Sequence, residues 1–435
     1  MTRPPIAFTD ALYGSWCRAW RQVVCIQARR LANWLGTQPQ SVVGGLIRVD
    51  RDQLVSSLPG LVANLELPSV GDDALGRAYG CLRELEARHR ADPRRLSSPP
   101  PCVQVGGGRH LLVPPMRHTA RPRGAGAGTF KLAGEIGVAG TLGLDYCWVP
   151  LQDDDILDWR REAALEALLT TPRLRLGLAP CATHEAMAWT IEADDPRGRD
   201  GRVPMHCLGT RDPETLWPAV ESLLAAAYDQ AVQVLVLPEL VLDQNLLVRT
   251  GDWLGRHNLP VPRLRLVVAG SRHCAEEGGG FANRCTVLDQ GGTILWEQDK
   301  RSPFVIDDAD TLDRLSPGCC APAAFEPTVL GRRLVVRETS VGRLLTPICL
   351  DFIDDALWSA LGADIFLVPA MSPGLERFRL KAQDLGSRHG AASFVCNAQT
   401  AGTERYVAYL PLRKPPVPTG RTGKELFILD IDLYV

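Results

Sequence analysis

The sequence lacks the features that mark membrane, secreted and nucleic-acid-binding proteins. Its 435 residues include no stretch that approaches the roughly 20 consecutive apolar residues needed to cross a bilayer. The segment Met1–Pro5 lacks the apolar core of a signal peptide. The formal net charge is −2, whereas a general binder of nucleic acids carries a clear excess of Lys and Arg. We therefore expect a cytoplasmic protein with no membrane span and no nucleic-acid partner.

The sequence also lacks the residue spacings that are typical of metal-binding and nucleotide-binding motifs. The 13 cysteines include no C-x-x-C pair, and their odd number in a long chain indicates reduced thiols. Zinc ligands could be imagined in His273 and Cys274 with Cys285, or in the adjacent Cys319 and Cys320. Neither group has the two-plus-two spacing of structural zinc sites, so no metal is expected. No glycine cluster has the G-x-x-x-x-G-K-[ST] pattern of a P-loop.

The composition is that of a folded protein, with 45% apolar and 23% charged residues, and the length indicates two domains, or one large domain with an extension. We interpret residues 1–170 as an N-terminal region of unknown role, mostly helical and then rich in Gly and Pro. Its apolar spacing predicts helices over residues 9–35, 74–89 and 153–169, and a short strand pair over 103–105 and 110–113.

Residues 171–435 alternate between short apolar runs and amphipathic segments, which indicates an α/β layer architecture. A polar excursion with Gly and Pro, over 194–204, separates the first strand from the first helix. Strands are expected over 174–180, 232–237, 264–269, 284–289 and 293–297, and helices over 213–230 and 354–361.

Three reactive side chains each follow directly on an apolar strand: Glu239, Lys300 and Cys349. In α/β sheets, reactive groups collect beyond the carboxyl ends of the strands. A carboxylate can accept the proton of a thiol, and a lysine can stabilise both a thiolate and an oxyanion. Each residue also has an ordinary structural explanation: a helix cap for Glu239, a solvated hairpin residue for Lys300, and a core thiol for Cys349.

The order and spacing of these residues resemble the nitrilase or carbon–nitrogen hydrolase superfamily over roughly residues 172–435. The resemblance implies a nitrilase-like α-β-β-α sandwich, a homodimer or higher homo-oligomer, and no cofactor. The segments that carry it are Val234–Glu239, Asn283–Lys300, Gly342–Asp351, Gly362–Pro369, Arg388–Asn397 and Leu426–Asp432.

The resemblance also implies roles for individual residues. Glu239 would be the general base, Lys300 the cation beside the oxyanion, and Cys349 the nucleophile. The backbone N–H of Leu350 would be the second oxyanion donor. A further glutamate of the family corresponds to Glu326, which is followed by Gly331. Four aspartates nearer to Lys300 stay open as alternatives: Asp307, Asp308, Asp310 and Asp313.

Other features bear on the substrate more than on the reaction. Asp351 and Asn397 are expected beside the oxyanion and the substrate. Family members usually have an aromatic residue after the cysteine, where this chain has Leu350. An insert over 181–211, which most members lack, separates the first strand from the first helix.

These observations favour a hydrolase of non-peptide carbon–nitrogen bonds, which acts on a small amide, nitrile or carbamoyl amine through a cysteine thioester. One alternative is an N-acyltransferase that uses the same site. Another is a regulatory or scaffold protein, in which the nitrilase-like domain binds a ligand or partner without turnover and the N-terminal region recognises a protein or a nucleic acid. A papain-like hydrolase with Cys349, His389 and Asn397 is disfavoured, because only 40 residues separate the cysteine from the histidine.

Overall fold

Most of the second half of the chain and parts of the first half are described in the computed structural model. The described residues are 10–26, 31, 58–63, 65, 71–91, 100, 102–105, 108–113, 147–162, 173–191, 202–259, 261–277, 280–317, 321–354, 356–398, 404–411, 420–422 and 426–432. Packing divides the chain into two compact units. One consists mainly of residues 1–115 and 121–155, and the other mainly of residues 156–359 and 363–435.

The first unit combines helices with a small sheet. The apolar residues of α5 recur at the spacing of one helix face, from Leu75 to Leu85, and pack with Trp16 and Trp20 of the α1 region into a core. The helices expected over 9–35 and 74–89 and the strand pair are therefore confirmed for the described residues. The elements are α1 (Asp10–Trp20), its π-helical continuation Arg21–Ile26, α5 (Asp72–Ala91), and the antiparallel strands β1 (Cys102–Val105), β2 (Gly108–Val113) and β3 (Cys147–Leu151).

The second unit contains two large sheets. The seven-stranded sheet has the order β11-β10-β9-β8-β5-β20-β19, and the six-stranded sheet has the order β18-β17-β16-β15-β14-β4. The strands of the first sheet are β5 (Arg173–Leu178), β8 (Val234–Val236), β9 (Leu266–Ala275), β10 (Phe281–Asp289), β11 (Ile294–Asp299), β19 (Gly420–Thr422) and β20 (Leu426–Asp432). Those of the second are β4 (Ile156–Arg161), β14 (Arg333–Thr339), β15 (Gly342–Leu345), β16 (Ile365–Ala370), β17 (Ala392–Asn397) and β18 (Tyr406–Tyr409).

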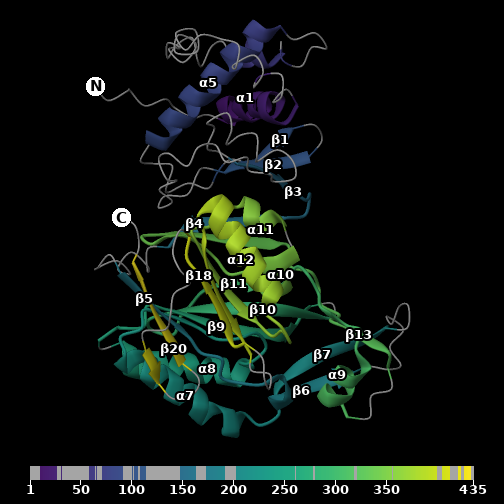
Figure 1. Ribbon diagram of the computed structural model, residues 1–435, viewed down its shortest axis with the longest axis vertical. Coiled ribbons are helices and arrows are strands. Elements are labelled where there is room, and N and C mark those ends of the chain that lie inside the picture. Colours follow the sequence, from purple (N-terminus) through teal and green to yellow (C-terminus); the bar gives the residue numbers. More distant parts are fainter. Residues whose placement is uncertain are drawn as a thin grey trace. The chain divides into compact units, whose positions relative to one another are not determined.

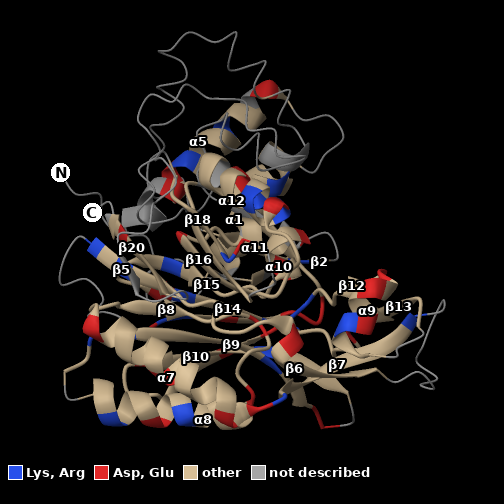
Figure 2. Cartoon of the chain, turned by 60° about the horizontal axis from the view of Figure 1, so that its bottom comes forward, with Lys and Arg blue, Asp and Glu red and all other residues tan. Residues whose placement is uncertain are grey.

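Helices cover the outer face of each sheet, which gives the expected α-β-β-α sandwich (Figure 1). The seven-stranded sheet is covered by α7 (Pro213–Asp229) and α8 (Gln244–Trp253), and the six-stranded sheet by α10 (Leu350–Asp354), α11 (Ala356–Ala360) and α12 (Glu376–His389). Charged residues of both signs lie on the outer helices and on several strands, whereas β16 and β17, in the middle of the six-stranded sheet, carry none (Figure 2). None of the described helices is long and apolar enough to span a membrane.

The helix α7 illustrates how the sequence builds one of these layers. Asp212 caps its first turn by accepting the N–H groups of Glu214 and Thr215, and Pro213 at the first position needs no hydrogen-bond acceptor. Its buried residues recur every three or four positions, from Leu216 to Ala227, and pack on the seven-stranded sheet. Burial of each large apolar side chain contributes about 1.5–3 kcal/mol.

The helix expected over residues 153–169 is a wrong prediction, because residues 156–161 form the strand β4. This strand pairs in parallel with β14, with Trp159 opposite Val336. Asp158 of β4 also makes a 2.9 Å ion pair with the buried Arg337 of β14. Pairing with a distant strand thus outweighs the local helical spacing. Residues 163–169 lie outside the described residues.

The insert over 181–211 forms a hairpin that the sequence did not predict. Its strands β6 (Met187–Ile191) and β7 (Arg202–Thr210) belong to a separate four-stranded sheet of the order β12-β13-β7-β6. The other two strands are β12 (Val305–Ile306) and β13 (Ala323–Phe325), and α9 (Ala309–Leu315) packs on them through Leu312 and Leu315. The hairpin therefore lies against the segment between Lys300 and Glu326.

Candidate functional site

Cys349 lies in a tight turn between the strand β15 and the helix α10. Its φ of 48° is unusual for a residue other than glycine, and its N–H donates to the Pro369 carbonyl at 3.0 Å. Such a conformation costs free energy and persists only where the surrounding structure fixes it. The side chain is almost completely buried in the six-stranded half of the sandwich. The fold thus presents this thiol at the end of the strand, as the sequence predicts.

Glu239 follows β8 at a second tight turn. The next residue, Leu240, has a φ of 61°. The turn packs against Gly270, where a Cβ atom would lie only 2.0 Å from the Pro238 carbonyl oxygen, so only glycine fits there. The Glu239 carboxylate accepts the Met371 N–H at 3.0 Å, which ties the end of β8 to the end of β16. The carboxylate is therefore held where the two sheets meet.

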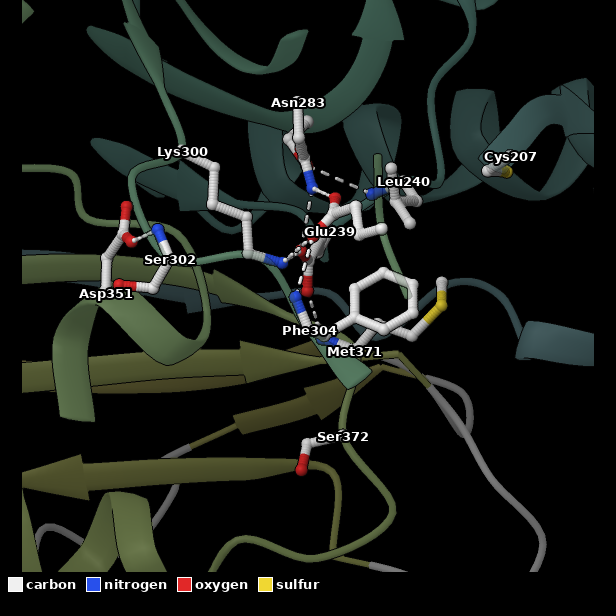
Figure 3. A network of polar contacts seen from close by, with 12 residues as sticks. Cys207, Glu239, Leu240, Asn283, Lys300, Ser302, Phe304, Asp351, Met371 and Ser372 are labelled. Atoms are coloured by element: carbon white, nitrogen blue, oxygen red, sulfur yellow. Dashed lines mark hydrogen bonds and ion pairs between the residues drawn. The ribbon is translucent and has the colours of Figure 1, made fainter. Parts of the chain in front are cut away.

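Lys300 places its ammonium group between two carboxylates. Its Nζ lies 2.8 Å from Glu239 Oε1 and 2.9 Å from Glu326 Oε2, and the side chain is fully buried. Burial alone would lower the pKa of Lys300, but Glu239 and Glu326, with a further contribution from Cys349, raise it above its ordinary value. Figure 3 shows the lysine pointing towards Glu239. The ammonium group stays charged in this setting.

Glu326 directly follows β13 and is saturated with donors. Its Oε1 lies 2.8 Å from His273 Nε2 and 2.7 Å from Asn283 Nδ2. Its Oε2 accepts from Lys300 Nζ and, at 3.1 Å, from the Phe304 N–H. Burial favours the neutral acid, but Lys300 and His273 outweigh it and hold the pKa of Glu326 well below its ordinary value. Glu326 is a fixed anion.

Asn283 links the two carboxylates, and sequence reasoning assigned it no role. Its Nδ2 donates to Glu239 Oε1 at 3.0 Å as well as to Glu326. The residue is fully buried on β10. Asn283 is the first residue of Asn283–Lys300, one of the segments that carry the family resemblance. That position was the only indication in the sequence that Asn283 belongs to the site. His273 was considered only as a zinc ligand, and nothing local in the sequence points to its contact with Glu326.

The thiol of Cys349 is surrounded by these charges. Burial is the largest influence and raises its pKa well above the ordinary value; the negative charge of Glu239 adds to this, and Lys300 opposes it. The resting group is therefore a neutral thiol beside a carboxylate that can accept its proton. This arrangement suits a nucleophile that is activated only when a substrate arrives.

Leu350 and Asp351 begin the helix α10 directly after the cysteine. The Asp351 carboxylate accepts the Arg301 N–H at 3.0 Å. It also accepts the Ser302 N–H at 2.7 Å, as Figure 3 shows. Burial raises the pKa of Asp351 to about 7, although these bonds and Lys300 act against it. Asp351 thus holds the segment after Lys300 against α10. The roles expected of both residues beside the oxyanion stay predictions.

Asn397 ends β17 and holds the loop after β16. Its Oδ1 accepts the Ser372 N–H at 2.8 Å, and its Nδ2 donates to the Ser372 carbonyl at 2.9 Å. The adjacent Met371 donates its N–H to Glu239, so Asn397 supports the site through this loop. A direct contact of Asn397 with substrate stays a prediction.

The structure does not bring the open alternatives to Lys300. Of these described aspartates, Asp308 caps α9, Asp307 lies 3.5 Å from Arg202, and none contacts the lysine. His389 ends α12, and its side chain lies outside the described residues.

A zinc site at His273 is not supported. Both ring nitrogens of His273 already have partners, Nδ1 with the Cys207 N–H and Nε2 with Glu326. Within the described part of the chain, no group of three or more His, Cys, Asp or Glu residues could hold a metal ion. Cys319 and Cys320 lie outside the described residues.

Comparisons with known proteins find structural likenesses only. No protein-family model matches the sequence, and neither does any curated protein. An amidase from Nesterenkonia sp. is 16% identical with a TM-score of 0.39, over 60% of this chain and 91% of that one. Nit3 of Saccharomyces cerevisiae, from branch 10 of the nitrilase superfamily, is 12% identical with a TM-score of 0.41, over 62% and 93%. The NitFhit protein of C. elegans is 15% identical with a TM-score of 0.42, over 61% and 62%.

Proposed function

We propose that this protein hydrolyses a non-peptide carbon–nitrogen bond through a thioester on Cys349. The observation that carries the proposal is the meeting of three strand-end groups in one buried place. Glu239 and Lys300 form a 2.8 Å ion pair, and the thiol of Cys349 lies beside both. A base, a cation and a nucleophile are the groups that acyl transfer needs.

The first half-reaction forms the thioester. Glu239 takes the proton of Cys349 as the sulfur attacks the amide carbon, and the carbonyl oxygen becomes an oxyanion. The Lys300 ammonium group and the Leu350 N–H stabilise this oxyanion. Glu239 then gives its proton to the leaving nitrogen, so ammonia or an amine departs as the carbon–nitrogen bond breaks.

The second half-reaction releases the acid. Glu239 accepts a proton from water while the water oxygen attacks the thioester carbon. The tetrahedral intermediate collapses, the carbon–sulfur bond breaks, and the proton returns to the sulfur of Cys349. The products are a carboxylic acid and the original thiol.

Glu326 has a different part in this proposal. Its four donors leave it no position to accept a proton from substrate, and its negative charge lies 2.9 Å from Lys300 Nζ. It therefore keeps the lysine charged and aimed while Glu239 cycles between its charged and neutral forms. Asp351 and Asn397 hold the loops on either side.

The substrate class that fits is a small amide, nitrile or N-carbamoyl amine. Transfer of the same thioester to an amine, in place of water, would make the protein an N-acyltransferase. We further propose a cytoplasmic homo-oligomer whose N-terminal unit, mainly residues 1–155, binds a protein partner. Size-exclusion chromatography with light scattering tests the oligomeric state.

The direct test is Cys349→Ala, assayed for ammonia or amine release on a panel of nitriles, amides, N-carbamoyl amines and glutamine. We expect the variant to be folded and inactive, whereas Cys396→Ala, which removes a buried thiol of β17, stays active. Retained activity in Cys349→Ala would refute the proposal. Addition of an amine acceptor distinguishes transfer, which yields an amide, from hydrolysis. A scaffold protein would release no product with any of these compounds and would show no selective labelling of Cys349 by iodoacetamide.

A further inference from the structure

The inserted hairpin reaches the candidate site through one histidine. The N–H of Cys207, on β7, donates to Nδ1 of His273 at 2.9 Å. The other ring nitrogen, Nε2, lies 2.8 Å from Glu326 Oε1. Cys207 and Glu326 are buried, and the His273 side chain has no exposed surface. We propose that His273 is a positioning residue. Its ring is held in one tautomer by the inserted hairpin, and in that tautomer it fixes Glu326 and, through Glu326, Lys300. This inference rests on the proposed function.

The hydrogen bonds settle which ring nitrogen carries the proton. A backbone N–H can only donate, so Nδ1 of His273 accepts from Cys207 and carries no proton. The ring proton is then on Nε2, which donates it to Glu326. An amide N–H does not give up its proton near neutral pH, so His273 cannot pass protons from one nitrogen to the other. It is a donor held in place and not a proton relay.

The hairpin also supports Glu326 through its backbone. Strand β7 pairs in parallel with β13, with Arg202 opposite Ala323 and Pro204 opposite Phe325. Glu326 is the next residue along the chain, so the hairpin fixes both its backbone and, through His273, its carboxylate. The insert thus completes the surroundings of one carboxylate.

The charged groups that face Glu326 come from several elements. Lys300 follows β11, His273 lies on β9, and Asn283 on β10 joins Glu326 to Glu239. Lys300 is therefore the cation held between the two anions, and a shift of Glu326 would move the ammonium group away from the oxyanion. A displacement of about 1 Å at a catalytic group can reduce the rate about 100-fold.

Two substitutions at His273 separate its two hydrogen bonds. His273→Gln places an amide N–H near the position of Nε2, so the donor to Glu326 is retained. His273→Asn places an amide oxygen near the position of Nδ1, so the acceptor for Cys207 is retained and the donor to Glu326 is lost. His206→Gln is the control. His206 is a buried histidine of β7, and its ring stacks on the Phe281 ring with the centroids 4.4 Å apart.

The readouts are kcat/KM with a substrate found by the panel and the rate of Cys349 alkylation by iodoacetamide, both measured against pH. We expect His273→Asn to lower kcat/KM by about tenfold to 100-fold. We expect His273→Gln and His206→Gln to stay within about threefold of wild type. Loss of the donor raises the pKa of Glu326, so the acid limb of both profiles moves to higher pH in His273→Asn only. Thermal unfolding identifies a variant that has lost its fold.

The imidazole ¹⁵N shifts of the wild-type protein provide a measurement that needs no variant. We expect the Nε2–H tautomer at His273; an Nδ1–H tautomer or an imidazolium would overturn the inference. Equal kcat/KM and pH profiles for a folded His273→Asn and the wild type would also overturn it. If wild-type Cys349 is not labelled selectively and no compound is turned over, the proposed function itself fails. Selective wild-type labelling with no difference among the variants refutes the positioning role alone.

Discussion

The two carboxylates that flank Lys300 are held in different ways. Glu239 lies beside the thiol of Cys349 and receives one backbone N–H, from Met371, on its Oε2. Glu326 has two donors on each oxygen, among them His273 on a strand beside the inserted hairpin. Both are buried, so burial does not distinguish them. The number of donors does: Glu239 has two on Oε1 and one on Oε2, so Oε2 has room to accept a proton, whereas Glu326 has four donors and no such room.

The largest expected effect is the loss of activity on substitution of Glu239. Glu239→Gln removes the base that takes the thiol proton, so we expect kcat to fall by at least about 10³-fold. Glu214→Gln is the control, because Glu214 is an exposed residue of α7 that pairs with Arg249. The assay is product release by each variant at equal folded concentration. A loss in Glu239→Gln no larger than in the control would show that another group is the base.

Glu326→Gln should cost more stability than Glu239→Gln. In Glu326→Gln one carboxylate oxygen is replaced by an amide NH2 group, and either oxygen position faces two hydrogen-bond donors. The NH2 group and those donors are then buried without an acceptor. We expect a loss of about 3 kcal/mol in the free energy of unfolding, measured in urea, and a smaller loss for Glu239→Gln. The order of the two variants in kcat should be the opposite. Equal losses of stability would show that the two carboxylates are not held differently.

The sequence predicts Glu239 and the strand-end residues around it better than it predicts the contacts that hold Glu326. Glu239, Lys300 and Cys349 each end an apolar run, and a strand end is a local feature. Asp351 and Asn397 could be named because they lie next to such ends. The α/β layer architecture follows from the alternation of strands and helices, and the α-β-β-α sandwich from the family resemblance. The structure confirms both over the described residues of 173–432.

The parts that could not be predicted depend on contacts between distant segments. Strand β7 lies in a polar insert, and its pairing with β13 joins residues more than a hundred positions apart. The role of His273 could not be predicted either, because its partner Cys207 lies on this hairpin, whose position the sequence does not reveal. The sequence predicts a helix where β4 forms, because the partner strand β14 lies even farther away along the chain. Tertiary contacts decide these positions, and local spacing does not.

Asp351 provides a second contrast with Glu326. Both are buried, but Lys300 contacts Glu326 directly, whereas Asp351 accepts backbone N–H groups and its pKa rises to about 7 from 3.8. Between these values the folded protein holds a proton that the unfolded chain releases, so this contribution to stability falls as the pH rises from about 4 to about 7. The wild-type protein should lose on the order of 4 kcal/mol of stability through Asp351 across that window, and Asp351→Asn should not show this loss.

The measurement for Asp351 is urea unfolding at several pH values between 4 and 8. The informative quantity is the difference between wild type and Asp351→Asn, because other groups titrate in both. Asp354→Asn, an exposed neighbour on α10 that pairs with Arg377, should leave the wild-type pH dependence unchanged. A difference that does not vary with pH would contradict the raised pKa.

The smallest expected effect tests whether the hairpin serves only the Glu326 side. Trp189 of β6 contacts the edge of the Phe304 ring, with centroids 6.3 Å apart, and that ring lies 5.0 Å from Lys300 Nζ. Trp189→Ala removes the contact, so we expect about 1 kcal/mol less stability and less than about a tenfold loss in kcat/KM. Trp189→Phe keeps an aromatic edge and should lose less of both. Because Trp189 and His273 both act on the Glu326 side, their effects on kcat/KM should be less than additive, whereas those of Trp189→Ala and Asp351→Asn should add. Full additivity with His273→Asn would mean that the hairpin acts on the site by two independent routes.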